Sequence, residues 1–230
     1  MNHLSFNSGI ILNTKMTIIS ESKKYNLAEE IASSITHGIG VALSIAGLTI
    51  SMIFASLYGN AWHIVGFCIF GITLILLYTS STLYHGFQIP KVKHIFRVID
   101  YSAIYLLIAG SYTPVILISM RNTLGWTILG LVWGMAFLGI TLKVLFFKKL
   151  QIVAVAFYLL MGWMIVFVVK PALVVVPRGL FYWLLAGGLC YTIGVIFFAL
   201  KKIPFNHTIW HLFVLGGSTL HFLGMFFYLI

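Results

Sequence analysis

The sequence predicts an all-α integral membrane protein built as a seven-transmembrane helix bundle. Hydrophobic residues make up 61% of the 230 residues and charged residues only 8%, with a mean hydropathy of +1.07. A soluble core of this size cannot hide so much apolar surface from water. Apolar runs of about 20 residues, the length that crosses roughly 30 Å of hydrocarbon, follow one another from residue 36 to the end. These observations together predict the fold class.

The chain divides into an N-terminal tail and one membrane domain. Residues 1–25 are polar and lack the long apolar stretch and cleavage site of a signal peptide, so we interpret them as a cytoplasmic tail. Residues 26–230 are interpreted as a single seven-helix transmembrane domain. Its predicted spans, in chain order, are 36–57, 62–84, 98–119, 123–146, 151–170, 179–200 and 207–229.

Each predicted span is separated from the next by a short joint that contains Gly, Pro, Asn or basic residues. Such residues interrupt helices or favour the membrane boundary, so they justify the division. The joints, in order, are 58–61 with Gly and Asn, 85–97 with Gly, Pro, Lys and Arg, 120–122 with Arg and Asn, 147–150 with two Lys, 171–178 with two Pro and Arg, and 201–206 with two Lys, Pro and Asn.

The basic residues predict how the bundle is oriented in the membrane. With the N-terminus inside, 11 of the 14 Lys and Arg residues fall in cytoplasmic segments, and only Arg121, Lys170 and Arg178 fall outside. The positive-inside rule therefore predicts a cytoplasmic N-terminus and an outside C-terminus. Basic loops next to anionic headgroups also account for the net charge of +10. We expect membrane lipids as partners and no nucleic-acid partner, because no folded surface is left for one.

Four residues with metal-binding or acid–base side chains fall at the cytoplasmic ends of their predicted spans: His85, Asp100, His207 and His211. His207 and His211 are four residues apart, so their imidazoles lie on one helix face, about 5 to 6 Å apart, and can bind one ion together. Ser81 and His85 have the same spacing. His221 lies ten residues beyond His211, about 15 Å deeper, which excludes it from that ion.

Other interpretations of these residues are open. Two histidines at a membrane boundary are often interfacial hydrogen-bonding groups, and Asp100 could cap a helix. However, Asp100 is one of only four acidic residues in the chain, and an acid at the edge of the hydrocarbon is a functional candidate. The shared depth of all four residues favours a metal site.

The first span carries a stripe of small and polar residues. Its members recur every three or four positions and therefore lie on one helix face: Glu30, Ser33, His37, Gly40, Ser44, Gly47 and Ser51. We expect this face to point into the bundle, with the small residues allowing close helix contact. Packing alone explains His37 poorly. Because such stripes serve dimers as well as single bundles, the oligomeric state stays open.

Four segments carry an ordered set of motifs: AEEIASSITHG at 28–38, SSTLYH at 80–85, RVIDYSAIY at 97–105 and HTIWH at 207–211. The set resembles the bacterial haemolysin III family, which belongs with the progestin and adipoQ receptors, including the adiponectin receptors. The resemblance covers the chain from about Glu29 onward and leaves out the first 25 residues. It implies seven helices with the N-terminus inside, in agreement with the charge distribution, and a multi-pass protein of the bacterial cytoplasmic (inner) membrane.

The resemblance also implies a zinc ion near the cytoplasmic face, held by three histidines that match His85, His207 and His211. The aspartate that matches Asp100 contacts the zinc-bound water, and the serine that matches Ser81 lies beside it.

Three further candidates on the first span receive no metal role from the resemblance: Glu30, Ser33 and His37. We expect them to support the site or to contact a substrate.

Three hypotheses for function follow. Three protein ligands with an open fourth position are typical of catalytic zinc, so the first is a zinc-dependent amidase acting on a ceramide-like lipid held in the bundle. The related alkaline ceramidases carry similar motifs, which supports this hypothesis by analogy. The second is a membrane sensor or homeostasis protein in which zinc is structural. The third is a cytolysin, although the chain shows no polar pore stripe.

Overall fold

The computed structural model describes the backbone of residues 3–146 and 151–230 and the side chains of residues 27–146 and 152–230. Every regular element in these residues is helical, which confirms the predicted class. The helices are α1 (His3–Tyr58), α2 (Ala61–Gly86), α3 (Pro90–Ser119), α4 (Thr123–Leu145), α5 (Gln151–Gly162), the 3-10 helix η1 (Met164–Val168), α6 (Val169–Val175), α7 (Arg178–Ala199) and α8 (Asn206–Leu229). The predicted tail falls within residues whose side chains are outside the described part.

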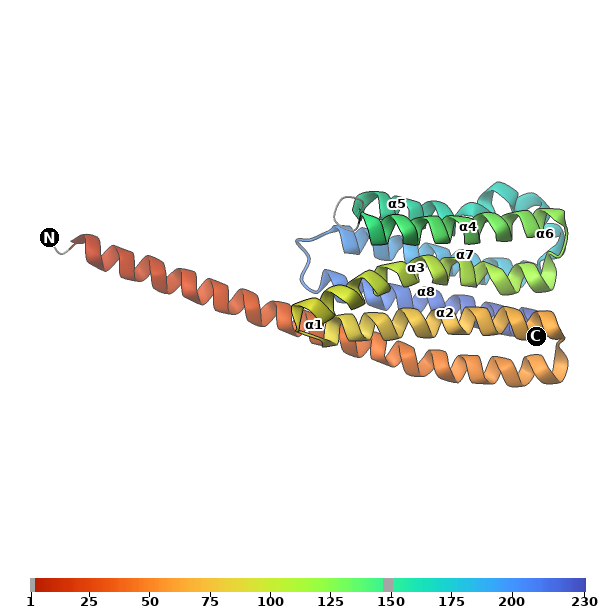
Figure 1. Ribbon diagram of the computed structural model, residues 1–230, viewed down its shortest axis with the longest axis horizontal. Coiled ribbons are helices and arrows are strands. Elements are labelled where there is room, and N and C mark those ends of the chain that lie inside the picture. The colour runs from red at the N-terminus through yellow and green to blue at the C-terminus, as the bar shows by residue number, and fades with distance from the viewer. Residues whose placement is uncertain (1–2, 147–150) are drawn as a thin grey trace.

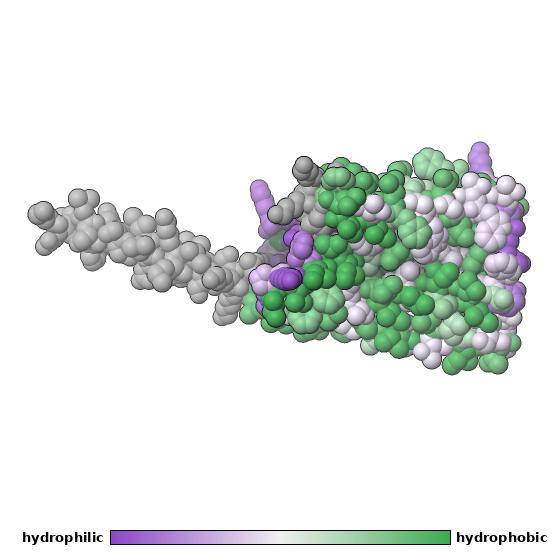
Figure 2. Space-filling model, in the orientation of Figure 1, coloured by the Kyte–Doolittle hydropathy of each residue, from purple (hydrophilic) through white to green (hydrophobic). Residues whose placement is uncertain are grey.

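Seven helical segments of the described chain are long and apolar enough to cross a membrane, and α5, η1 and α6 together make the fifth. The helices lie alongside one another, with the chain termini at opposite ends (Figure 1). Apolar residues cover the sides of the bundle and hydrophilic ones gather near its two ends (Figure 2). This is the surface expected of a multi-pass membrane protein, whose sides contact lipid.

Local sequence signals explain where the helices begin. Asn60 caps α2 by accepting from the Trp62 N–H at 2.9 Å, and Asn122 caps α4 by accepting from the Gly125 N–H at 2.9 Å. Pro90 occupies the first turn of α3, where no N–H is needed. The third span therefore begins at Pro90, eight residues earlier than predicted.

The fifth span differs most from the prediction of one continuous helix over 151–170. It breaks after Gly162, passes through η1 and resumes as α6. Pro171 lies in the first turn of α6, where its missing N–H costs nothing. Tyr112 of α3 covers the break. Its hydroxyl lies 2.8 Å from the Gly162 carbonyl and accepts from the Ile165 N–H at 3.2 Å.

The predicted stripe of α1 faces the bundle, as expected. Its members from Ser33 to Ser51 are buried, and they pack α1 against α2 and α8. The first and last spans of the chain are therefore neighbours. The most extensive other contacts run α2 to α3, α3 to α4 and α7 to α8, and α3 also contacts α5 and α8. This arrangement brings the end of α2 and the start of α8 together at the end of the bundle where α1 enters it (Figure 1).

Candidate metal centre

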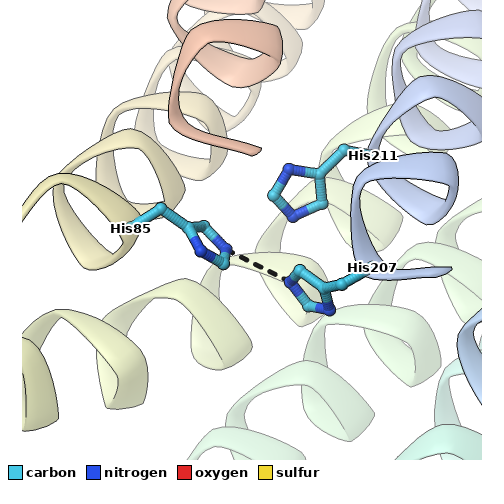
Figure 3. Close-up of side chains that lie close together, drawn as sticks. All are labelled: His85, His207 and His211. Carbon is cyan, nitrogen blue, oxygen red and sulfur yellow. Dashed lines mark hydrogen bonds between the residues drawn. The ribbon is translucent and has the colours of Figure 1, made fainter. Parts of the chain in front are cut away.

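Three histidines from two helices converge at this end of the bundle. His85 comes from the last turn of α2, and His207 and His211 come from the first two turns of α8. One ring nitrogen of each lies within 4.8 Å of the others, and His85 Nε2 is 3.1 Å from His207 Nε2. Figure 3 shows the three rings turned toward a common point. The i, i+4 spacing on α8 places both of its rings on one face of that helix, within reach of His85.

The donor set fits a zinc ion. Two nitrogens bound to tetrahedral zinc at about 2.0 to 2.1 Å are roughly 3.3 Å apart, close to the 3.1 Å between His85 and His207. Three imidazoles leave one position open. Neutral nitrogen donors suit zinc and other late divalent metals better than magnesium or calcium, which prefer oxygen.

Two of the rings are held so that Nε2 is free for a metal. His85 Nδ1 is 2.8 Å from Glu30 Oε2, and His211 Nδ1 is 3.2 Å from the Ser33 carbonyl oxygen. Carbonyl and carboxylate oxygens can only accept a hydrogen bond. Nδ1 must therefore be the donor and carry the proton in both rings. The remaining Nε2 lone pair is then available for a metal.

The start of α8 is held by α1 as well. The His207 N–H donates to Glu29 Oε1 at 3.1 Å, and the Ser33 and Thr208 hydroxyls are 2.9 Å apart. Glu29 was not among the residues predicted from sequence. A glutamate at the N-terminus of a distant helix leaves no local pattern, because the contact spans 178 positions.

Charged residues surround the cluster. Lys93 Nζ lies 2.8 Å from Glu30 Oε2, so one carboxylate oxygen contacts both a histidine and a lysine. Lys201 lies in the joint before α8. Burial lowers the pKa of its ammonium, and the negative charge of the Glu29 carboxylate partly offsets this decrease. Lys93, like Glu29, was missed by sequence reasoning. It was counted only as a cytoplasmic charge.

Asp100 and Ser81 lie beside the histidines. Asp100 is 6% exposed and Ser81 is fully buried. The Asp100 carboxyl group lies next to the Ser81 hydroxyl without the geometry of a hydrogen bond, and Ser81 Oγ has no hydrogen-bond partner among the described residues. A buried carboxyl and a buried hydroxyl at a metal-type cluster are groups that can transfer a proton and donate to an oxygen.

His37 is the most unusual residue of α1. It is 2% exposed, and its ring stacks on that of His211 with 3.5 Å between centroids and 7° between planes. Neither of its nitrogens has a hydrogen-bond partner among the described residues. It is not one of the three clustered histidines, and its ring lies directly against one of them.

The cluster opens on a largely apolar cavity of about 250 Å³. His37, Ser81, Asp100, His207 and His211 line one part of it, and the rest is lined mainly by side chains of α3, α5, α7 and α8, with others from α2, η1 and α6. The cavity continues toward His221, whose Nε2 is 3.0 Å from the Leu184 carbonyl oxygen. His221 does not belong to the histidine cluster, in agreement with its predicted depth.

Comparison with known proteins identifies the relatives of this chain. The family described as haemolysin-III related matches residues 25–222. The chain belongs to the haemolysin III family. The chain is 48% identical over 206 residues to the Hemolysin-3 homolog of Bacillus subtilis (strain 168). This alignment covers 90% of the chain and 97% of that protein. The chain is 47% identical over 216 residues to Hemolysin-3 of Bacillus cereus, with 94% and 97% covered.

A more distant relative connects this haemolysin III protein with a wider group. The chain is 33% identical over 211 residues to the human Monocyte to macrophage differentiation factor, and the alignment covers 87% of the chain and 84% of that protein. This relation fits the progestin and adipoQ receptor superfamily, in agreement with the resemblance found in the motifs. The chain is therefore a multi-pass membrane protein of the haemolysin III family, with a histidine cluster that could hold a metal ion.

Proposed function

We propose that this protein is a zinc-dependent hydrolase of the bacterial cytoplasmic membrane that cleaves the amide bond of a ceramide-like lipid. One observation carries the proposal: three convergent imidazole nitrogens lie beside Asp100 and Ser81 at one part of an apolar cavity. An apolar cavity inside a membrane bundle suits an acyl chain, and the polar groups at its edge suit the bond that joins the chain to its headgroup.

His85, His207 and His211 would hold the zinc. When bound, zinc supplies a Lewis acid that polarises a carbonyl oxygen and makes water nucleophilic near neutral pH. Asp100 accepts a proton from the attacking water on a carboxylate oxygen and passes it to the amide nitrogen as the C–N bond breaks. The Ser81 Oγ–H donates to the oxygen of the scissile carbonyl as negative charge develops there. The apolar cavity wall excludes bulk water from this reaction.

The test has two parts, and metal analysis of the purified protein comes first. Wild type should contain about one zinc per chain, and His211→Ala should contain much less. Wild type without metal would overturn the proposal. A panel of amide and ester lipids should then show turnover that falls about 100-fold or more in Asp100→Asn. Zinc retained without turnover of any lipid in the panel would reject the hydrolase.

A structural or sensory zinc is the second candidate. Its support is that the candidate ligands come from two helices, so a bound ion would tie α2 to α8. In that case chelation would lower the thermal stability of the bundle, and Asp100→Asn would leave metal binding unchanged.

The name of the Bacillus cereus relative, Hemolysin-3, suggests a third candidate, membrane lysis. Purified protein added to dye-filled lipid vesicles would release the dye if lysis were its activity. We expect no release.

A further inference from the structure

We propose that a single turn of α1, Glu29 to Ser33, is the outer shell of the metal centre and that Glu30 sets its affinity for metal. This turn contacts each of the three candidate ligand residues: the Glu30 carboxylate and the Ser33 carbonyl contact the rings of His85 and His211, and the Glu29 carboxylate accepts from the backbone N–H of His207. The inference rests on the metal site of the proposed function. It adds to that site the residues that orient its ligands.

Glu30 is the positioning residue of the shell. Its Oε2 lies 2.8 Å from His85 Nδ1, which fixes the ring plane and keeps the proton on Nδ1. A carboxylate also increases the electron density that the opposite nitrogen offers to a metal. Losing such a partner typically lowers metal affinity by about 10- to 100-fold.

Lys93 holds the Glu30 carboxylate in place. Its Nζ is 2.8 Å from the same Oε2 that contacts His85, and it comes from the first turn of α3. Glu30 therefore connects α1, α2 and α3 at one point. The lysine restricts the carboxylate to the position from which it can reach His85.

Glu29 and Ser33 act on α8. Glu29 Oε1 accepts from the His207 N–H, one of the N–H groups that a helix start leaves without an internal partner. The Ser33 carbonyl sets the tautomer of His211, and the Ser33 hydroxyl contacts Thr208 on the first turn of α8. These contacts set the distance of both α8 histidines from α2.

The competing explanation is that these contacts only pack α1 against its neighbours. Ser34 separates the two explanations, because its hydroxyl donates to the Thr82 carbonyl of α2 at 3.1 Å and contacts no histidine in the cluster. Ser34→Ala thus removes one hydrogen bond between α1 and α2 at the same depth and is the matched control. A packing role predicts similar effects for Ser34 and Glu30.

The experiment measures zinc affinity of the purified full-length protein by competition with a chromophoric chelator, together with the thermal midpoint of the metal-free protein. Glu30→Ala should bind zinc about 10- to 100-fold more weakly than wild type. Glu30→Gln should lose less, because the amide oxygen still accepts from Nδ1–H. Ser34→Ala should bind zinc as wild type does.

If wild type binds zinc and Glu30→Ala binds it within about twofold of wild type, the outer shell is wrong while the zinc hydrolase stands. Wild type without zinc overturns both proposals. If Glu30→Ala does not fold, Lys93→Met provides the test. A severalfold loss of zinc affinity, with no decrease in the thermal midpoint of the metal-free protein, supports the outer shell. Unchanged zinc affinity rejects it. If Ser34→Ala lost as much zinc affinity as Glu30→Ala, the contacts of α1 would act through packing alone. That result would also reject the outer shell.

Discussion

Buried polar groups without partners lie around the histidine cluster, although some, such as Ser51 Oγ, lie elsewhere in the described bundle. Ser81 Oγ and both nitrogens of His37 are buried and make no hydrogen bond among the described residues. Each such group costs about 1 to 3 kcal/mol relative to a satisfied one. Ser80, the neighbour of Ser81, shows the usual solution, because its hydroxyl donates to the Leu77 carbonyl at 3.0 Å. The unsatisfied groups are consistent with a site that receives a polar ligand.

Ser81→Ala should therefore stabilise the protein while it impairs the proposed reaction. Removing an unsatisfied buried hydroxyl is expected to raise the free energy of unfolding by about 1 kcal/mol. Losing the donor to the scissile carbonyl should lower turnover by roughly 100-fold or more. Thermal unfolding in detergent and lipid turnover measure the two effects. Ser80→Ala is the control and should keep full turnover while losing some stability. A less stable Ser81→Ala would contradict this account.

Sequence reasoning identified residues whose signal is local. The i, i+4 pair of His207 and His211 and the position of His85 at the end of a span predicted that these rings share one end of the bundle, and the structure brings them together. Glu29 and Lys93 carry no such signal, because their contacts with His207 and Glu30 depend on how α1, α3 and α8 pack. The catalytic roles of Asp100 and Ser81 stay predictions.

At the scale of elements, the broken fifth span is the main departure from regular helical geometry. Inside a membrane, free carbonyl and N–H groups have no water to bind, so a break requires partners from the protein. Tyr112 supplies them to Gly162 and Ile165. The break follows Gly162, but apolar runs alone do not reveal it because a 3-10 turn is equally apolar.

Tyr112→Phe should destabilise the protein by about 1 to 3 kcal/mol, since it leaves the polar groups of the break unsatisfied. Unfolding in a denaturing detergent measures the loss. Tyr158→Phe is the matched control, because its hydroxyl donates at 2.8 Å to the carbonyl of Tyr101 inside the continuous helix α3. Its effect should be smaller. Equal effects would mean that the break needs no special partner.

Several glycines allow the close contact between α7 and α8, and Gly187 is one of them. A Cβ atom at Gly187 would overlap the imidazole of His221, whereas one at Gly188 would meet only ordinary contact with Trp163. Gly187→Ala should cost about 1 to 3 kcal/mol through overpacking. Gly188→Ala should be neutral or stabilising by up to about 1 kcal/mol, because alanine favours helix more than glycine does. Thermal midpoints of the two variants provide the comparison, and a stable Gly187→Ala would contradict it.

At the scale of the whole molecule, composition was sufficient to predict the class. Seven apolar segments predicted seven spans, and the described part of the chain has seven helical segments long enough to cross a membrane. Span boundaries were less predictable, because polar residues such as those of 27–35 and 90–97 continue helices beyond the apolar run. Orientation in the membrane is a consequence of charge and needs its own measurement.

The charge distribution predicts that the end bearing the histidine cluster faces the cytoplasm. A C-terminal fusion to alkaline phosphatase should be active, and a C-terminal fusion to green fluorescent protein should be dark. Truncated fusions ending at Lys201 should show the opposite pattern and serve as the internal control. A fluorescent full-length fusion would reverse the assigned orientation and place the cluster on the outside.

The histidine cluster also has a consequence for the order of events during biosynthesis. His85 and His207 are separated by 122 positions, and both α8 histidines belong to the last of the described helices. When the first six spans have been synthesised, only one of the three clustered imidazoles, that of His85, is present. The pocket for an ion comes into existence after translation of α8, when the newest helix docks against the oldest. Metal uptake would thus mark a bundle in which α8 has joined α1 and α2.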